Sequence, residues 1–239
     1  MISWPVARAA ARERLRSSAT AAIGLCLLAT GAFSGGPGSG RETFSQFGFG
    51  FFLLLTLALG AGLLSDELDS GHAQLVLLRP VTRAAWVGGR LAGAGMALAA
   101  VVAAAWGATA ASAAARGYGF SLARLAVLPL AVLWGFAWLS VLTALGTVFP
   151  GWTNAGALLL AGLAWATVRF TLPLALGKPE WAQPLAAIGH YLGPQDPLPL
   201  AFHLREGLGP ALYDLCWVFF AWLLAALLFN RRELARRRA

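Results

Sequence analysis

A short acidic stretch, DELDSG, interrupts a chain that is otherwise strongly apolar on both sides. Asp66 and Asp69 stand three residues apart, a spacing at which two carboxylates can help to bind a metal ion at a membrane edge. His72, Arg79 and Arg83 follow within the same polar segment. If this chain carries out chemistry, this segment is the first place to look for it.

A metal-dependent phosphotransfer site is one hypothesis that these carboxylates suggest. Six-span enzymes that transfer phosphatidyl groups from CDP-lipids carry the pattern DxxDGxxAR followed by GxxxDxxxD. In this chain Ser70 intrudes before the required glycine, and Gln74 stands where an arginine is needed. The later aspartates, Asp196 and Asp214, do not form the second pair that a two-metal site requires. A membrane-embedded phosphotransferase is therefore the weakest alternative.

Other chemical signals are weaker still. The glycine-rich run GGPGSGRET has Arg41-Glu42 where a phosphate-binding loop needs Lys-Ser/Thr, and no strand precedes it. His190, Asp196 and His203 fit no metal-ligand spacing. The sequence therefore predicts no catalytic residue and no metal site, and the chain itself is not expected to be an enzyme.

The segments around the acidic stretch are typical of membrane spans. Hydrophobic residues make up 59% of the 239, charged residues only 12%, and the mean hydropathy is +0.69. Soluble proteins carry about 25% charged residues, and a helical span needs about 20 mostly apolar ones. The sequence predicts an all-α membrane protein with six transmembrane helices. They are Ser17–Phe33, Phe44–Leu64, Trp86–Ala115, the two halves of the uncharged run from Leu125 to Val168, which FPGWTN interrupts, and Pro210–Phe229.

Arginine placement predicts the topology. An even number of spans puts both termini on one side, and placing them in the cytoplasm gives that side twelve of the eighteen basic residues. The net charge of +8 then belongs to membrane flanks, and without a nucleic-acid motif we expect no nucleic-acid partner. The chain is predicted to be a multi-pass protein of the inner (plasma) membrane.

Three segments outside the spans have characters of their own. Residues 1–16 are predicted to form a basic cytoplasmic helix. Residues 178–209 are predicted to form broken external interfacial helices, over Glu180–Leu192 and Leu198–Leu208, with an ordinary loop as the alternative. Residues 66–83, between the second and third spans, are predicted to form a short amphipathic cytoplasmic helix.

Turn signals bound this amphipathic segment. Ser65 or Asp66 can cap its start, and Ser70-Gly71 permits a bend. Pro80 disfavours helix at the residue before it, and Thr82 is a plausible cap for the next helix. A helix held in this way between two spans can take a push from a soluble partner and pass it to both.

The run DELDSGHAQLVLLRPVTRAAWVGGRLAG resembles the signature of ABC-2-type transporter permeases, the membrane subunits of a class of ATP-driven exporters. His72 and Arg90 replace the family's usual Thr and Lys. The basic N-terminal segment, GHYLGPQDPLPLAF before the last span and FNRRELARRR at the end are also similar to the family, so the resemblance covers residues 1–239 as a single permease domain. The matching positions are Glu67, Ser70-Gly71, Leu77-Leu78, Pro80-Val81-Thr82-Arg83 and Gly89-Arg90.

The resemblance implies a division of labour between subunits. Two permease subunits, identical or homologous, would form the translocation pathway among membrane lipids, and two separate ATPase subunits would carry ATP and Mg. This chain would then hold no cofactor of its own. The resemblance implies that the coupling helix, the family's ATPase contact, is the Glu67–Arg79 segment. The expected contact residues are Glu67, Ser70, Gly71, Leu75, Leu78, Arg79, Pro80 and Arg83.

Further expectations concern individual charges and the cargo. Glu67 is expected to pair with a nearby base such as Arg14 or Arg83. Arg169 and Asp214 are ionisable groups inside predicted spans, where such residues either mark a pathway or snorkel to the interface. The scarcity of charge in the spans favours a lipidic, amphipathic or peptide-like cargo. A membrane anchor or assembly factor without transport activity is the alternative function.

Overall fold

The protein is built from helices, and among the described residues there is no strand. The structure, a computed structural model of the 239-residue chain, describes residues 3–33, 49–69, 81–118, 127–195 and 204–236. The elements are α1 (Trp4–Arg16), α2 (Ser18–Phe33), α4 (Phe49–Gly60), α5 (Ser65–Asp69), α7 (Arg83–Ala115), α8 (Val127–Gly146), α9 (Thr153–Ala175), η3 (Pro179–Trp181), α10 (Ala182–Tyr191) and α11 (Leu204–Arg236).

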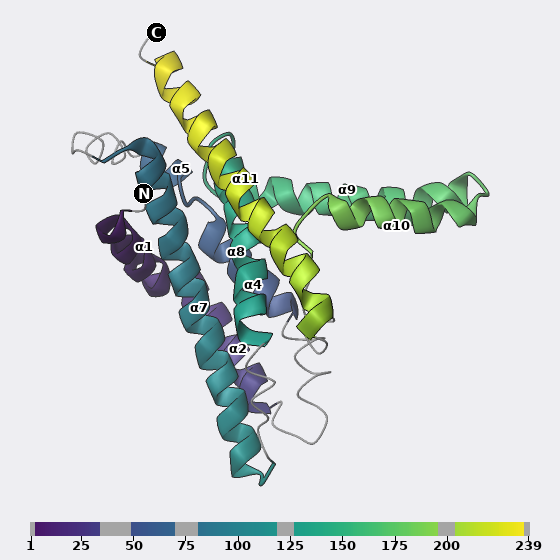
Figure 1. Ribbon diagram of the computed structural model, residues 1–239, viewed down its shortest axis with the longest axis horizontal. Helices are drawn as coiled ribbons and strands as arrows, with labels where there is room; N and C mark the ends of the chain where they lie inside the picture. The colour runs from purple at the N-terminus through teal and green to yellow at the C-terminus, as the bar shows by residue number, and fades with distance from the viewer. Residues whose placement is uncertain (1–2, 34–48, 70–80, 119–126, 196–203, 237–239) are drawn as a thin grey trace.

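Helices α2, α4, α7, α8 and α11 form a bundle, in which α7 and α11 are the longest members with 33 residues each (Figure 1). Its core is made of aliphatic residues from α4, α7 and α8, such as Leu55 and Leu98, both with no exposed surface. The rings of Phe52 and Trp134 stack there with centroids 5.3 Å apart. These helices are apolar on more than one side because they have neighbours on more than one side.

Five described helices are long and apolar enough to cross a membrane, and α1 with α2 would make a sixth if the bent pair is one span. The prediction of an all-helical, multi-pass membrane protein is therefore confirmed at this level. The predicted basic helix over residues 1–16 is also confirmed as a helix, α1, and it meets α2 at a bend of 71°. The segment between the second and third spans begins with a helix of five residues, α5, and most of the predicted amphipathic helix over residues 66–83 lies outside the described residues.

The bend lets α1 lie against α7 at a place where α7 has two glycines. A Cβ atom added at Gly93 would lie 2.6 Å from the Cβ of Ala10, and one added at Gly89 would lie 2.9 Å from the carbonyl oxygen of Ser3. Real Cβ atoms do not approach this closely, so the groove exists because both residues are glycine. Ala7 and Ala10 are completely buried in it.

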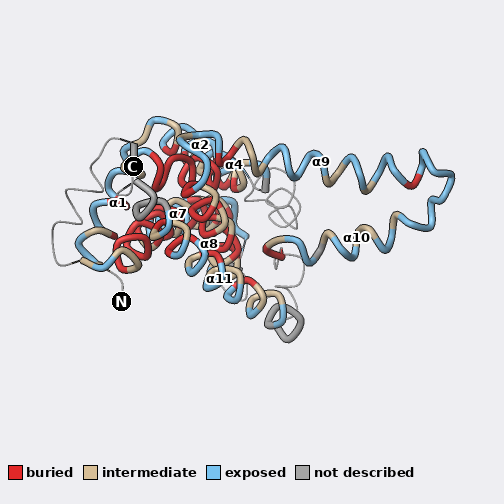
Figure 2. The backbone as a smooth tube through the Cα atoms, turned by 90° about the horizontal axis from the view of Figure 1, so that it is seen from above, coloured by how far each residue is buried: buried red, intermediate tan, exposed pale blue. Residues whose placement is uncertain are grey.

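Helices α9 and α10 form a hairpin that projects sideways from the bundle (Figure 1). Figure 2 shows that most of this hairpin is exposed, whereas buried residues concentrate in the bundle. In the most apolar stretch of α9 only 6% of the residues are buried, against 67% for the stretch that contains α4. The apolar run before and after FPGWTN was expected to give two adjacent spans; the chain breaks there as predicted, but α9 leaves the bundle.

The last helix begins earlier than predicted. We expected a separate short helix over Leu198–Leu208 and a span from Pro210, but α11 runs without interruption from Leu204 through Pro210. A proline removes one helical hydrogen bond, and helices in membranes tolerate this loss when neighbouring groups compensate for it. The other expected interfacial helix, Glu180–Leu192, is present as η3 followed by α10.

Candidate functional site

One end of the bundle gathers most of the polar contacts that link different helices. The C-terminal end of α1, the end of α4 with α5, the start of α7, the FPGWTN break and the end of α11 all meet there. The segment 66–83 leaves from this end and returns to it. We call this region the polar joint, defined by Glu13, Arg14, Ser65, Glu67, Arg83, Arg90, Gly151, Asn154 and Asn230.

Arg90 lies at the centre of the polar joint. Its side chain is only 4% exposed, and one guanidinium nitrogen, Nη1, donates to Oε2 of Glu13 at 2.8 Å. The other, Nη2, forms an ion pair with Oε1 of Glu67. Glu13 comes from α1 and Glu67 from α5, so one buried cation on α7 connects both elements. A buried charge is costly unless it is paired, and this pairing makes the position of Arg90 tolerable.

Arg14 adds a second link between α1 and the end of α4. Its Nη1 donates a hydrogen bond of 2.8 Å to the carbonyl oxygen of Ala61. Burial lowers the pKa of Arg14 from its ordinary value, and the carboxylate of Glu13 opposes this effect. Because a guanidinium stays protonated even so, Arg14 is a permanent charge that interacts with Asp66 and Glu67 of α5.

The FPGWTN break docks on the same end of α4. Ser65 Oγ accepts a hydrogen bond of 2.7 Å from the backbone N–H of Gly151, whose carbonyl oxygen accepts from Gly62. Asn154 is completely buried and donates to the carbonyl oxygens of Gly60 and Leu142, each at 3.2 Å. Gly62 and Gly151 have φ angles of +65° and +52°, which favour glycine. The ends of α4 and α8 and the start of α9 are thereby fixed together.

The return of segment 66–83 to the bundle is also fixed. Thr82 caps α7 as predicted, since its Oγ1 accepts a hydrogen bond of 3.3 Å from the N–H of Ala85. Arg83 donates to the side-chain oxygen of Asn230 on α11 at 3.3 Å. Trp86, which is 1% exposed, stacks on Phe229 with centroids 5.3 Å apart. The start of α7 is therefore attached to the end of α11.

The predicted coupling residues can now be placed in part. Glu67 and Arg83 lie in the polar joint, at the two ends of segment 66–83. Glu67 pairs with Arg90; Arg14 and Arg83, the expected partners, contact Ala61 and Asn230 in the hydrogen bonds just described. The other predicted contact residues lie outside the described residues. They are Ser70, Gly71, Leu75, Leu78, Arg79 and Pro80.

The two candidate pathway residues lie on different helices. Asp214 on α11 is completely buried, and its Oδ1 accepts a hydrogen bond of 2.9 Å from the backbone N–H of Gln195. It therefore fixes the chain between α10 and α11 to the last helix. Arg169 on α9 lines a cleft between α9 and α10. Their role in a pathway stays a prediction.

Sequence reasoning missed three residues that organise the site: Arg90, Glu13 and Asn154. Arg90 was noted only as part of the matching Gly89-Arg90 position, and its place between Gly89 and Gly93, beside a groove of small residues, was a signal that it faces whatever fills the groove. Asn154 could have been noticed as an amide at the end of a long uncharged run. Neither pattern indicates which residues Arg90 and Asn154 contact.

The contacts of the polar joint tie several helices together. Its arginines contact carboxylates, a backbone oxygen or, for Arg83, the side-chain oxygen of Asn230. Within the part of the chain that the structure describes, no three His, Cys, Asp or Glu side chains gather as metal ligands would. The expectations of no metal and no catalytic residue stay predictions.

Comparisons with known proteins add no relative. No protein-family model matches this chain, and a search of curated proteins finds no match. The case for a function therefore depends on the residues and their geometry.

Proposed function

We propose that this protein is the transmembrane subunit of an ATP-binding-cassette exporter of the ABC-2 type. In this proposal the chain forms the translocation pathway with a second permease subunit, and segment 66–83 receives the movement of separate ATPase subunits. Both termini and this segment would face the cytoplasm. ATP and Mg would be bound by the partner, in keeping with the lack of a Lys-Ser/Thr phosphate loop in this sequence.

One observation carries the proposal: segment 66–83 is attached to the bundle at both of its ends. At its start Glu67 binds the buried Arg90 of α7 and, through it, α1. At its end Thr82 caps α7 and Arg83 binds Asn230 of α11. Because both ends of the segment are held by side-chain contacts, a force on it is passed to α4, α7, α1 and α11 together. An unattached loop of this length would absorb the movement.

The second candidate, a membrane anchor or assembly factor, is favoured by the exposed α9–α10 hairpin, which a partner protein could cover. It does not account for the attachment of segment 66–83 at both ends. An anchor needs only apolar helices, and nothing in that role requires a buried arginine that joins two elements.

Copurification tests the proposal directly. The full-length chain, extracted in mild detergent, should bring with it an ATPase subunit that carries a Walker loop. Leu78→Asp should abolish the copurification, because it places a charge on the apolar surface predicted to meet the ATPase. Tyr118→Asp, at the far end of α7, is the matched control and should leave the complex intact. If the complex contains no ATPase, or if Leu78→Asp retains it fully, the proposal is wrong.

Cysteine labelling tests the sidedness on which the proposal depends. The native cysteines, Cys26 and Cys216, are both exposed, so they are first replaced by serine. Single cysteines at positions 78 and 118 are then treated with a membrane-impermeant maleimide on intact cells. We expect labelling of position 118 from outside and of position 78 only after the membrane is opened. The reverse pattern excludes an ATPase contact at segment 66–83.

A further inference from the structure

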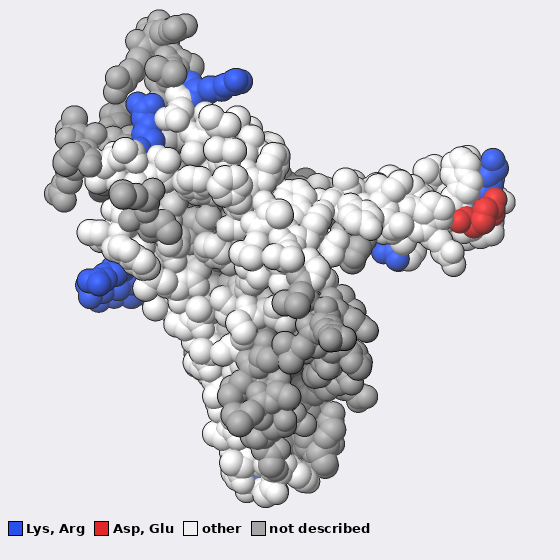
Figure 3. Space-filling model, in the orientation of Figure 1, with Lys and Arg blue, Asp and Glu red and all other residues white. Residues whose placement is uncertain are grey.

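The α9–α10 hairpin contains one charged side chain between its base and its tip. From Thr153 to Gln195 the charged residues are Arg169, Lys178 and Glu180, of which the last two lie at the tip, next to η3. Figure 3 shows a hairpin surface that is mostly uncharged, with a basic group below it and a basic and an acidic group at the tip. Arg169 is therefore a lone cation within an apolar surface.

The surroundings of Arg169 are apolar and exposed. On α9 the adjacent Phe170 is 62% exposed, and Leu172, three residues after Arg169, is 40% exposed. Ile188 on α10 is 52% exposed. In a helix that is long and apolar enough to cross a membrane, such a surface faces acyl chains. An arginine there is costly unless it reaches a polar interface or a counter-charge.

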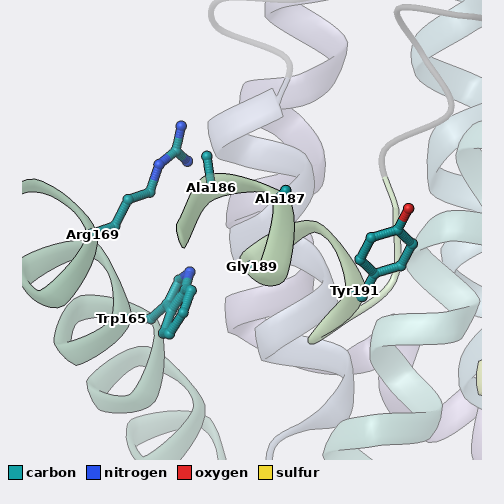
Figure 4. A pocket seen from close by; sticks show the side chains of 6 residues that line it. All are labelled: Trp165, Arg169, Ala186, Ala187, Gly189 and Tyr191. Carbon is teal, nitrogen blue, oxygen red and sulfur yellow. The ribbon is translucent and has the colours of Figure 1, made fainter. Parts of the chain in front are cut away.

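A cleft of about 520 Å³ lies beside this arginine. Trp165 and Arg169 line it from α9, and Ala186, Ala187, Gly189 and Tyr191 line it from α10 (Figure 4). The α10 wall is low at Ala186, Ala187 and Gly189, because these residues are small. A Cβ atom at Gly189 would clash with Nε1 of Trp165, so the absence of a side chain there leaves the indole room in the cleft.

The donors in the cleft are suited to an anion. In Figure 4 the guanidinium of Arg169 and the indole nitrogen of Trp165 both extend from α9 toward α10. The guanidinium carbon lies 5.1 Å from the centroid of the Phe170 ring, a cation–π contact that uses the face of the group and leaves its N–H edges available. Among the described residues, no carboxylate forms an ion pair with Arg169. Guanidinium edges bind phosphate oxygens in a bidentate manner.

The tip of the hairpin carries a side-chain pair of a kind that is common at membrane interfaces. Lys178 lies 4.8 Å from the ring centroid of Trp181, and lysine with tryptophan is a typical interfacial anchor. A long arginine side chain on an apolar surface can extend its guanidinium toward the membrane interface. The guanidinium of Arg169 is therefore able to meet a lipid phosphate in the cleft.

We propose that the cleft between α9 and α10 binds the phosphate headgroup of an anionic phospholipid, with Arg169 as its counter-charge and the exposed apolar side chains as the seat of its acyl chains. This inference requires a membrane location but not transport, so it can hold or fail independently of the proposed exporter function. A phospholipid is favoured over a soluble anion because the charge stands alone within an apolar surface.

Native mass spectrometry of the full-length protein in detergent tests the proposal. The protein is titrated with dioleoyl phosphatidylglycerol, dioleoyl phosphatidylcholine or inorganic phosphate. We expect a preference for phosphatidylglycerol, and Arg169→Gln should weaken its binding about tenfold, with phosphatidylcholine binding unchanged. Arg169→Lys should keep part of the preference, because it keeps the charge. Arg116→Gln, an exposed arginine at the end of α7, is the matched control and should bind as the unaltered protein does.

A second pair of variants tests the cleft itself. Gly189→Leu fills the low wall and should reduce phosphatidylglycerol binding while Arg169 is intact. Gly162→Leu, on α9 with open space around it, should have no effect. If Arg169→Gln prevents folding, Arg169→Lys and Gly189→Leu decide the question.

Three results would overturn the proposal. The first is no change in phosphatidylglycerol binding in the Arg169→Gln and Gly189→Leu variants. The second is an equal loss for phosphatidylglycerol and phosphatidylcholine, which would indicate only apolar contact. The third is a site that inorganic phosphate fills and from which it displaces the lipid, which would indicate a soluble anion as the ligand.

Discussion

Removing Glu67 should destabilise the protein more than removing Glu13, although both carboxylates bind the same arginine. Arg90 is 4% exposed, Glu67 21% and Glu13 57%. A fully buried ion pair that loses one member costs about 3–5 kcal/mol, and an exposed pair about 0–1 kcal/mol. Glu67 is partly exposed and Arg90 keeps its second partner, so we expect Glu67→Gln to cost about 1–3 kcal/mol. Glu13→Gln should cost less than about 1 kcal/mol.

The measurement is the free energy of unfolding, obtained by titrating the detergent-solubilised protein with sodium dodecyl sulfate and following helix content. A double-mutant cycle with Arg90→Met isolates the pair, because each single change also alters solvation. The coupling free energy of positions 67 and 90 should be about 1–3 kcal/mol. That of positions 13 and 90 should be smaller, about 0.5 kcal/mol.

The expected order follows from burial alone, so it can fail clearly. If Glu13→Gln is as destabilising as Glu67→Gln, solvent exposure does not control the strength of these pairs. A coupling free energy near zero between positions 67 and 90 would mean that the ion pair contributes nothing to the linkage of α5 with α7. In either case the attachment of segment 66–83 would have to depend on other contacts.

Three further predictions concern the packing around this site. Gly93→Val should displace α1 and increase proteolysis of the N-terminal segment. Gly107→Val, on the same helix with open space around it, should not increase proteolysis. Equal proteolysis of both variants would exclude the glycine groove as the docking site of α1. Asn154→Leu should lower the free energy of unfolding by about 1–3 kcal/mol, because the carbonyl oxygens of Gly60 and Leu142 lose the side-chain donor that joins them. The exposed control Thr167→Val should change the free energy of unfolding by less than about 0.5 kcal/mol. Thr82→Ala should lower the free energy of unfolding by about 1 kcal/mol. Thr82→Ser should leave it almost unchanged, because serine retains the capping oxygen. An equal loss of stability in both variants would indicate that the capping hydrogen bond is not its cause.

The helices were predictable because their signals are local. Hydropathy located the apolar runs, Thr82 was recognised as a cap, and FPGWTN was recognised as a break. The start of the last helix was not predicted correctly. Proline usually ends a helix, but Pro210 lies inside α11. Whether a proline ends a helix depends on neighbours that a local pattern does not contain.

Partners were much harder to predict than elements. Glu67 was expected to pair with Arg14 or Arg83, and the sequence contains nothing that orients Arg90 toward it instead. That choice depends on the rotation of α7, which the groove at Gly89 and Gly93 sets by receiving α1. The direction of α9 was equally hidden, because a helix that is apolar on all sides has no face that indicates a neighbour.

The docking of α1 on α7 has a consequence for the order of synthesis. A ribosome releases the first helix well before the glycines that receive it, so the two cannot meet while the chain is still short. Until then Ala7 and Ala10 have no groove to enter, and Glu13 has no buried cation to bind. The N-terminal helix can therefore dock only once the first turns of α7 have been made, although α8, α9 and α11 need not yet exist.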